Sequence, residues 1–417
     1  MNATIINIGD ELLLGQVVNS NAAVMAQMMA QAGFGVERTI VVGDNADDIR
    51  RAIDESIQLT PIVLITGGLG PTKDDITKHL LADYFGSELY ENSEALATVT
   101  RIITGLGRPM TELNRRQAWV PKCCRVLNND VGTAPCMWFD HPKGVIISMP
   151  GVPFEMQWLV QHRVLPTLAQ RFSVGCIVKK NILIEGIGES FLSDLIEPWE
   201  LALPKELGVA YLPVAGMVKL RLTARANTVS ETSKMQSLID NAVASLQPLA
   251  GKYIVGYDAE TLEELVHREL SAQSLTLAAA ESCTGGTIVQ RLTALPGASA
   301  FLKGGVVAYC NEAKHHLLNV PQNVLDEHGA VSEPTVIAMA QGVRRQMNAD
   351  YALATTGIAG PGGAEEGKPV GTVWVAIDSE KGTEAQLLHL RGERQPIVDR
   401  TVNHLFAMLL RHVRSLQ

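Results

Sequence analysis

Apolar runs and amphipathic stretches alternate along the first domain-sized part of the chain. The apolar runs 3–9 (ATIINIG), 61–68 (PIVLITGG) and 144–151 (GVIISMPG) contain few polar residues, and helix-like stretches such as 19–33 (NSNAAVMAQMMAQAG) separate them. Strands of this kind are typical of a parallel sheet that helices cover on both faces. The pattern therefore predicts an α/β domain over residues 1–170.

The alternation of apolar strands with helices is interrupted after residue 170 and resumes near residue 258. Residues 171–255 include the run 217–226 (MVKLRLTARA), which alternates apolar and polar positions, and they predict a small α+β domain. In 258–417 strands and helices alternate again, with helices expected to begin near residues 285, 311, 333 and 396. The predicted fold class is α/β, with two parallel or mostly parallel α/β domains joined by a small α+β domain.

Composition and charge exclude several classes of protein. The 417 residues carry a formal net charge of −9, which gives no overall attraction to nucleic acid or to an anionic membrane surface. The start, MNATIINIGDE, has no basic segment and reaches acidic residues too early for a signal peptide, and no uncharged apolar run is long enough to cross a bilayer. The six cysteines lack the CxxC spacing of a zinc site. We expect a cytoplasmic protein with reduced thiols, no structural metal and no membrane contact.

Two candidate nucleophiles, Ser282 and Cys283, are adjacent in the segment 277–292 (LAAAESCTGGTIVQRL), where a predicted strand leads into a helix. Such a turn projects side chains at the carboxyl edge of a sheet, and the first helix amides, near Gly285 and Gly286, can hold an oxyanion or a phosphate. The same residues also suit a plain helix N-cap. The segment alone leaves both interpretations open, and the thiol ionises more readily than the hydroxyl.

A serine nucleophile needs a base, and the sequence offers Lys314 in the segment AYCNEAKHHLL, just past another strand end. Neighbouring strand ends in a parallel sheet can bring Lys314 to Ser282, and burial would lower its pKa enough to make it a base. A surface lysine is the alternative. A third segment, ATTGIAGPGG, places Thr356 and a glycine-rich loop after a strand, and this loop would either bind a phosphate or form a mobile turn.

Several segments in order resemble the C-terminal domain of the competence- and damage-inducible CinA proteins: AAAESCTGG, GGVVAYCNEAK, GAVSEPTVIAMA, and TTGIAGPGG followed by KPVGTVWVAI. The resemblance covers residues 258–417. That domain is similar to nicotinamide-nucleotide amidohydrolases, which convert nicotinamide mononucleotide (NMN) and water to nicotinate mononucleotide and ammonia without a cofactor. The resemblance implies a Ser–Lys dyad of Ser282 and Lys314, with Tyr309 and Thr356 in the catalytic set.

The chemistry of the reaction and the charges of the substrate suggest the substrate contacts. Ser282 Oγ would attack the carboxamide carbon while neutral Lys314 takes its proton, and early helix amides would hold the oxyanion. The carboxylate of Glu281 is expected to face the pyridinium charge of NMN. The residues expected to line the substrate or to hold its phosphate are Cys283, Thr284, Gly285, Gly286, Gly357, Gly360 and Arg394.

The N-terminal segments GDELLLGQVVNSNA, TGGLGPTKDDITK and MPGVPFEM resemble the CinA N-terminal domain, which is similar to molybdopterin-binding domains. The resemblance covers about residues 1–170. In some members this domain hydrolyses ADP-ribose to AMP and ribose 5-phosphate with a divalent metal, Mg²⁺ or a transition ion. Gly67, Gly68 and Gly70 follow a predicted strand, where their amides can surround a phosphate.

Carboxylates in these segments are the candidate metal ligands, because hard cations prefer carboxylate oxygens. They are Asp10, Asp74 and Asp75, with Glu11 beside the first. Asp74 and Asp75 also precede a predicted helix, so helix capping is the alternative, and one can cap while the other binds metal. The family pattern GTAPG reads GTAPC here, and the side chain of Cys136 is expected to crowd the ligand or to fill an otherwise open pocket.

The middle segment resembles the KH-like domain of full-length CinA proteins but has no GxxG between residues 172 and 250, so no direct nucleic-acid binding is expected. It is interpreted as a spacer or dimerisation domain, and a homodimer is expected. The predicted function is NMN deamidation in pyridine nucleotide salvage, with a metal-dependent ADP-ribose pyrophosphatase in the N-terminal domain. The alternative is a non-catalytic nucleotide- or pterin-binding protein that serves recruitment in competence and DNA repair.

Overall fold

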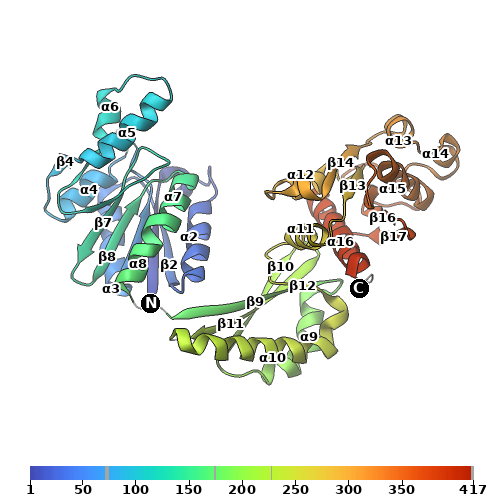
Figure 1. Cartoon of the computed structure of the whole chain (residues 1–417), viewed down its shortest axis with the longest axis horizontal. Coiled ribbons are helices and arrows are strands. Elements are labelled where there is room, and N and C mark those ends of the chain that lie inside the picture. Colours follow the sequence, from blue (N-terminus) through green and yellow to red (C-terminus); the bar gives the residue numbers. More distant parts are fainter. Residues whose placement is uncertain (71–74, 173–174, 227, 415–417) are drawn as a thin grey trace. The chain divides into compact units, whose positions relative to one another are not determined.

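The chain forms two compact units in the computed structural model, which describes residues 1–70, 75–172, 175–226 and 228–414. The first unit comprises Met1–Val178 and Arg225–Lys234, and the second comprises Lys179–Ala224 and Met235–Gln417. Figure 1 shows their elements along the chain. Within the described residues, no helix combines the length and the apolar character that crossing a bilayer requires.

The first unit is built on a six-stranded sheet with the order β2-β1-β3-β8-β7-β6. The four strands from β2 to β8 run parallel, while β7 and β6 are antiparallel to their neighbours. This arrangement agrees with the predicted parallel core and adds an antiparallel edge. The strands are β1 (Asn2–Ile8), β2 (Gly35–Val42), β3 (Ile62–Thr66), β6 (Arg125–Leu127), β7 (Cys136–His141) and β8 (Gly144–Met149).

Helices cover both faces of this sheet, because its central strands are apolar on both sides. Leu64 belongs to one hydrophobic cluster together with residues of α2, α7, η1 and α8, and Ile65 belongs to a second cluster with residues of α3 and α4. The π-helix η1 leads into α8 at Pro166, which has no amide hydrogen for a regular helical bond. The helices are α2 (Ser20–Gln31), α3 (Ala46–Leu59), α4 (Thr77–Tyr84), α7 (Pro153–Leu159), η1 (Val160–Val164) and α8 (Leu165–Arg171).

Several short elements of this unit were not predicted. A two-stranded antiparallel ribbon, β4 with β5, and two helices form a small lobe between α4 and β6. Four of these segments have only three to five residues, too few to show a hydrophobic period, whereas α5 has 13 residues and was missed in the sequence. They are α1 (Asp10–Leu13), β4 (Leu89–Glu91), α5 (Ser93–Gly105), α6 (Glu112–Arg116) and β5 (Trp119–Pro121).

The second unit begins with the predicted α+β segment, a four-stranded sheet of order β10-β11-β9-β12. Its two helices pack on each other, and the indole nitrogen of Trp199 donates to the carbonyl of Ala242 at 3.0 Å. The elements of the α+β segment are β9 (Cys176–Glu185), α9 (Glu189–Leu201), β10 (Leu207–Val214), β11 (Met217–Ala226), η2 (Val229–Glu231), α10 (Thr232–Ala250), η3 (Gly251–Tyr253) and β12 (Ile254–Tyr257). Of these, η2 and the adjoining ends of β9, β11 and α10 fall within the first unit.

The remainder of the second unit is a five-stranded sheet of order β14-β13-β15-β16-β17. Strand β13 is parallel to β14 and β15, whereas β16 is antiparallel to β15 and β17 is antiparallel to β16. Two of the four strand pairings are therefore parallel. Residues 380–381 alone connect the last two strands, and so short a turn can join only antiparallel partners. The strands are β13 (Leu277–Glu281), β14 (Leu302–Val307), β15 (Tyr351–Gly357), β16 (Thr372–Ser379) and β17 (Gly382–His389).

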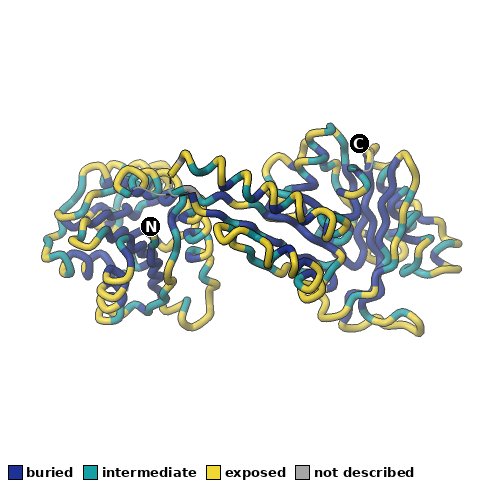
Figure 2. The backbone as a smooth tube through the Cα atoms, turned by 90° about the horizontal axis from the view of Figure 1, so that it is seen from below, coloured by how far each residue is buried: buried dark blue, intermediate teal, exposed yellow. Residues whose placement is uncertain are grey.

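Helices again cover both faces of this sheet, whose central strands β13, β15 and β16 are buried along nearly their whole length, whereas the edge strands β14 and β17 are partly exposed (Figure 2). On one face Leu353 packs with α11, α12 and α16, and Leu183 of β9 belongs to the same cluster. On the other face small side chains such as Ala354 pack with α13, α14 and α15. The helices are α11 (Leu262–Ala272), α12 (Thr287–Thr293), η4 (Ala298–Ala300), α13 (Asn311–Leu318), α14 (Gln322–His328), α15 (Glu333–Met347) and α16 (Arg394–Arg414).

Candidate functional site

Ser282 lies in the turn between β13 and α12, at the carboxyl edge of the second unit's five-stranded sheet. Its amide donates to the carbonyl of Thr355 on β15 at 3.1 Å, and the amide of Ala308 donates to the carbonyl of Glu281 at 2.8 Å. The turn is therefore bonded on both sides by segments that follow its neighbouring strands. Ser282 is 8% exposed, so its hydroxyl is held in a nearly dry environment.

Lys314 reaches Ser282 from the next helix. Its ammonium nitrogen, Nζ, lies 3.0 Å from Ser282 Oγ and 2.8 Å from the carbonyl oxygen of Ala308. The lysine is 1% exposed, and none of the ion pairs formed within the described residues includes it. Burial lowers the pKa of Lys314 below its ordinary value, because the charged form loses its hydration. The geometry is that of a hydroxyl beside an amine that is available as a base.

Cys283 is less suited to attack than Ser282. Burial raises the pKa of the Cys283 thiol to about 12, against smaller opposing effects of the neighbouring Lys314 and Arg394. A thiol with so high a pKa remains protonated near neutral pH, and the thiolate is the nucleophilic form. Of the two adjacent groups, the hydroxyl of Ser282 is therefore the better placed to attack, because it has the amine of Lys314 in contact.

Glu281 occupies a different place from the one expected. Its side chain is fully buried, and its two carboxylate oxygens accept hydrogen bonds from the amides of Gly286, Ile288 and Val289 at 3.0–3.1 Å. It therefore closes the N-terminus of α12, where a negative charge is favoured. A pairing of this carboxylate with a pyridinium ring does not fit the geometry, since no part of the group reaches the surface.

The amides expected to hold an oxyanion are also already bonded. The amide of Gly285 donates to the carbonyl of Ser282 at 3.1 Å, and that of Gly286 donates to Glu281. Gly285 and Gly286 instead supply left-handed turns, with φ of +62° and +101°. Among the described residues, the amides of Cys283 and Thr284 have no backbone acceptor. These two amides are the donors still available beside Ser282.

Thr356 and Thr284 are bonded within the protein. The hydroxyl of Thr356 donates to the carbonyl of Ala330 at 2.7 Å, and the hydroxyls of Thr284 and Thr355 lie 2.8 Å apart. Gly357 lies against β16, where a Cβ would come within 2.7 Å of the carbonyl oxygen of Thr372. These residues fix the end of β15 beside the turn that carries the serine.

Arg394 connects the glycine-rich loop to Tyr309. Its guanidinium donates to the carbonyl of Gly360 at 2.8 Å and to the Tyr309 hydroxyl at 2.8 Å. Tyr309 is 62% exposed, so the pair lies at the surface. No carboxylate in the described chain pairs with Arg394, which leaves its charge available to an anion.

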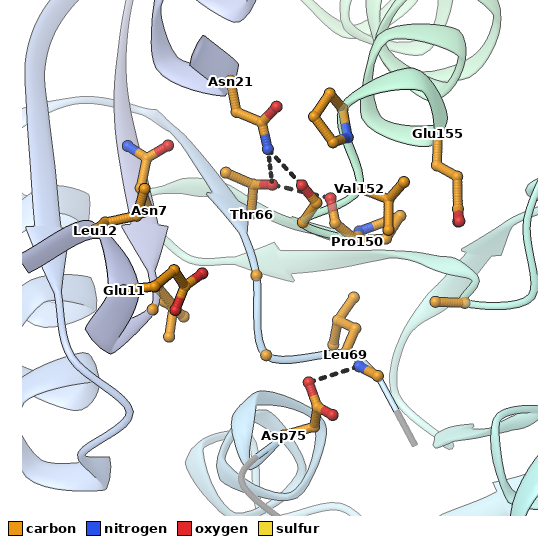
Figure 3. Close-up of a pocket in the computed structure, with 18 of the residues that line it drawn as sticks. Asn7, Glu11, Leu12, Asn21, Thr66, Leu69, Asp75, Pro150, Val152 and Glu155 are labelled. Atoms are coloured by element: carbon orange, nitrogen blue, oxygen red, sulfur yellow. Dashed lines mark hydrogen bonds between the residues drawn. The ribbon is translucent and has the colours of Figure 1, made fainter. Parts of the chain in front are cut away.

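The first unit contains a cavity of about 430 Å³ at the carboxyl ends of β1 and β3. Gly67, Gly68 and Gly70 line it, and Figure 3 shows Leu69 of the same segment among the lining residues. A Cβ on Gly67 would overlap the carbonyl oxygen of Ile8, and one on Gly68 would overlap the hydroxyl of Thr77, so the close approach of these segments requires glycine.

Of the expected metal ligands, Asp75 and Glu11 line this cavity, but the described ones do not come together as a coordination set. Asp10 and Asp44 bond reciprocally, each carboxylate accepting from the other's amide at 3.1–3.2 Å, and Asp75 accepts from the amide of Gly70 at 2.8 Å (Figure 3). Asp74 lies outside the described residues. Within the described ranges no cluster of three His, Cys, Asp or Glu side chains has the arrangement of a metal site. The described carboxylates therefore do not fit a resident metal ion.

Cys136 does not crowd the cavity, and the expectation drawn from it is wrong. The residue is fully buried at the start of β7 and belongs to a hydrophobic cluster with Trp138. Thr133 and Ala134 line the cavity instead. The chain turns into β7 just before Cys136, which directs the thiol into the core.

Three amide side chains of this cavity were not anticipated. Asn7, Asn21 and Gln117 each line it and have a buried carbonyl oxygen with no hydrogen-bond partner within the described residues. The amide nitrogens of Asn7 and Asn21 donate to the carbonyls of Ile40 and Gly151, which fixes their orientation (Figure 3). Buried acceptors of this kind favour a ligand with hydroxyl or amine donors. A polar Asn7 inside an otherwise apolar strand was the signal in the sequence.

Comparison with known proteins matches the chain along its length. Family models described as "Probable molybdopterin binding domain", "Damage-inducible protein CinA KH domain" and "CinA C-terminal domain" match residues 4–170, 179–256 and 259–413. A CinA-like protein of Cytophaga hutchinsonii is 42% identical over 100% of this chain and 99% of its own length. A putative competence-damage inducible protein of Moorella thermoacetica is 38% identical, with 100% and 99% covered.

A solved structure is also similar in part. The competence damage-inducible protein A of Klebsiella pneumoniae is 37% identical, covers 38% of this chain and 100% of its own, and has a TM-score of 0.37.

Proposed function

The chain belongs to the CinA family, and from that premise we propose that its C-terminal domain deamidates NMN. The observation that carries the proposal is the 3.0 Å contact between Lys314 Nζ and Ser282 Oγ, in which the lysine is buried and has no described carboxylate partner. A buried amine without a counter-ion favours its neutral form, which is the form that a general base needs.

The proposed reaction has two halves. In the first, Ser282 Oγ bonds to the carboxamide carbon of NMN while its proton passes to neutral Lys314. The tetrahedral intermediate then breaks its C–N bond, and the proton on Lys314 goes to the leaving nitrogen, which departs as ammonia. In the second half, water gives a proton to Lys314 and its oxygen attacks the nicotinoyl ester. The ester C–O bond breaks, the proton returns to Ser282 Oγ, and nicotinate mononucleotide leaves.

Two features of the site would assist this reaction. The amides of Cys283 and Thr284 are the donors we assign to the oxyanion, in place of those of Gly285 and Gly286, which are bonded within the turn. A single good donor of this kind contributes about 3 kcal/mol to the barrier reduction. Arg394 is the cation that we assign to the NMN phosphate.

Ammonia release from NMN by the purified full chain tests the proposal. We expect Ser282→Ala and Lys314→Ala to lose nearly all activity, and Cys283→Ala to keep most of it because the thiol takes no part. Full activity in Ser282→Ala would remove the dyad from consideration. Absence of ammonia release in the unaltered chain would instead favour the alternative, a nucleotide- or pterin-binding protein that serves recruitment.

For the N-terminal domain we propose binding of ADP-ribose in the glycine-lined cavity, with hydrolysis to AMP and ribose 5-phosphate. The side-chain carbonyl oxygens of Asn7 and Asn21, which lack a hydrogen-bond partner within the described residues, support the binding of a ligand that contains a sugar. Ribose hydroxyls can donate hydrogen bonds to such oxygens. Hydrolysis in the family requires a divalent metal, which the described carboxylates do not fit, so we assign no step to one.

Binding and hydrolysis are separated by two measurements on the full chain. Calorimetric titration with ADP-ribose reports binding, and AMP release with and without added Mg²⁺ or Co²⁺ reports hydrolysis. Asp75→Ala is expected to weaken both, because Asp75 holds the amide of Gly70 in the glycine segment. Binding without AMP release under any of these conditions would leave this domain a nucleotide-binding module.

A further inference from the structure

A second cavity of about 640 Å³ adjoins the glycine-lined cavity of the first unit. Gly70, Asp75 and Gln117 line both of them, so the two spaces meet at these residues. The residues that line the second cavity also include Trp119, which does not line the first, and we name this space the Trp119 cavity. Its volume is sufficient for an aromatic base with its sugar.

The wall of the Trp119 cavity carries an accessible aromatic ring. Trp119 begins β5 and is 39% exposed, and Leu113 of α6 is 53% exposed. Lys78 of α4 fastens this wall, because its ammonium donates to the carbonyls of Arg116 and Gln117 at 3.1 and 3.2 Å while the lysine itself is 9% exposed. The segment that leads to the indole is therefore bonded to α4, whose residues Lys78 and His79 also line the cavity.

The two cavities differ in charge. The described residues that line the glycine cavity include four carboxylates and no Lys, Arg or His: Glu11, Asp44, Asp75 and Glu155. The described walls of the Trp119 cavity carry three basic side chains, Lys78, His79 and Arg116, together with the carboxylates of Asp75 and Glu112, and Glu112 pairs with Arg116 at 3.3 Å. Of the two described walls only that of the Trp119 cavity carries cations, so an anionic group of a ligand that enters the glycine cavity meets its basic partners on that side.

Gln117 marks the connection between the two spaces. The residue is 7% exposed, and its amide oxygen is buried without a hydrogen-bond partner in the described chain. An unpaired buried amide costs stability unless a ligand or water bonds to it. A ligand that passes from one cavity to the other would contact this group.

We propose that the Trp119 cavity is the base subsite of a nucleotide whose sugar occupies the glycine cavity. The aromatic base stacks on the Trp119 indole, Gln117 bonds to the ligand where it crosses the junction, and its phosphates lie on the side of Lys78 and Arg116. This inference rests on the proposed nucleotide binding by the N-terminal domain, and it adds a determinant of base recognition. Stacking accepts any flat ring, so the subsite selects an aromatic base rather than one particular base.

Calorimetric titration of the full chain with ADP-ribose, AMP and ribose 5-phosphate tests the subsite. In Trp119→Ala we expect the affinity for ADP-ribose and AMP to fall by about tenfold, because the stacking partner is lost. The affinity for ribose 5-phosphate should remain within about twofold of the unaltered chain, since this ligand has no base. Trp119→Phe keeps a ring and should lose less than Trp119→Ala. Trp158→Ala is the matched control, because Trp158 belongs to the same unit, stacks on His162 and lines neither cavity.

The outcomes distinguish a failure of the base subsite from a failure of the proposed nucleotide binding. Equal binding of ADP-ribose by the unaltered chain and a folded Trp119→Ala variant overturns the subsite and leaves nucleotide binding intact. An equal loss for all three ligands also overturns it, because a general distortion of the cavity would produce that result. If the unaltered chain binds none of the ligands, both proposals fail together. Near-ultraviolet circular dichroism of each variant reports whether the first unit has kept its packing.

Discussion

Lys314 and Ser282 contact each other across two neighbouring strand ends, 32 residues apart in the sequence. Strand β13 delivers the serine and its parallel neighbour β14 leads to the helix that carries the lysine. The lysine is buried without a described acidic partner, and burial holds its pKa below the ordinary 10.5. The pH dependence of the reaction follows from this relationship.

The deamidase rate is expected to rise with pH through the pKa of Lys314. Because the base must be neutral, kcat/KM falls as pH drops below that pKa, and burial places this limb below 10.5. Lys314→Arg should lose activity throughout, since an arginine remains protonated. The measurement is a pH profile of ammonia release. A limb at or above the ordinary lysine value would contradict the assignment of Lys314 as a desolvated base.

Glu281→Gln is expected to lower both activity and stability. The carboxylate accepts from three amides, whereas a glutamine would turn an NH₂ group towards one of those donors. We expect a loss of about 1–3 kcal/mol in unfolding free energy. A displaced Ser282 should lower kcat by about tenfold or more with little change in KM. Thermal unfolding and steady-state kinetics measure the two effects.

Glu312→Gln is the matched control for this variant, because Glu312 is an exposed carboxylate in the first turn of α13. It should leave both quantities close to their starting values. If Glu281→Gln instead raised KM for NMN with kcat unchanged, the carboxylate would be a substrate contact, and its assignment as a positioning residue would be wrong.

Arg394→Lys is expected to raise KM for NMN by about tenfold with a smaller effect on kcat, because a lysine loses the paired donors that suit a phosphate. The same change breaks the contacts with Gly360 and Tyr309, whereas Tyr309→Phe removes only the second contact and should have a smaller effect. Arg345→Lys, an exposed position on α15, serves as the control. A fall in kcat with constant KM would place Arg394 in support of the dyad instead of at the phosphate.

Gly67→Ala is expected to abolish ADP-ribose binding and leave NMN deamidation unchanged. The residue has φ +111° and its Cβ would overlap the carbonyl oxygen of Ile8, so the end of β3 must shift. Gly86→Ala is the control that separates the cost of a positive φ from the cost of the steric overlap. Gly86 also has a positive φ (+58°), but a Cβ there would meet open space. We expect Gly86→Ala to lose about 1–2 kcal/mol of stability and to keep binding. Calorimetry and thermal unfolding distinguish these results.

The sequence by itself determined the alternation of elements and the identity of the candidate residues. The apolar runs became β1, β3, β8 and β13 within a residue or two, because a strand buried on both faces must be apolar throughout. The adjacent Ser282 and Cys283, together with Lys314 past the next strand end, were recognisable because parallel strands place their carboxyl ends at one edge. The family membership was recognisable from the same motifs.

Only the tertiary structure decided which group each side chain contacts. The sequence does not distinguish a glutamate that faces a substrate from one that caps a helix. Glu281 is fully buried and accepts hydrogen bonds from three amides, which identifies it as a helix cap. The thiol of Cys136 is turned into the core by the direction of β7, which no local pattern specifies. The tertiary structure also shows that Trp119 and Gln117 line a cavity. The segments that form this cavity are distant in sequence and have no periodicity by which they could be predicted.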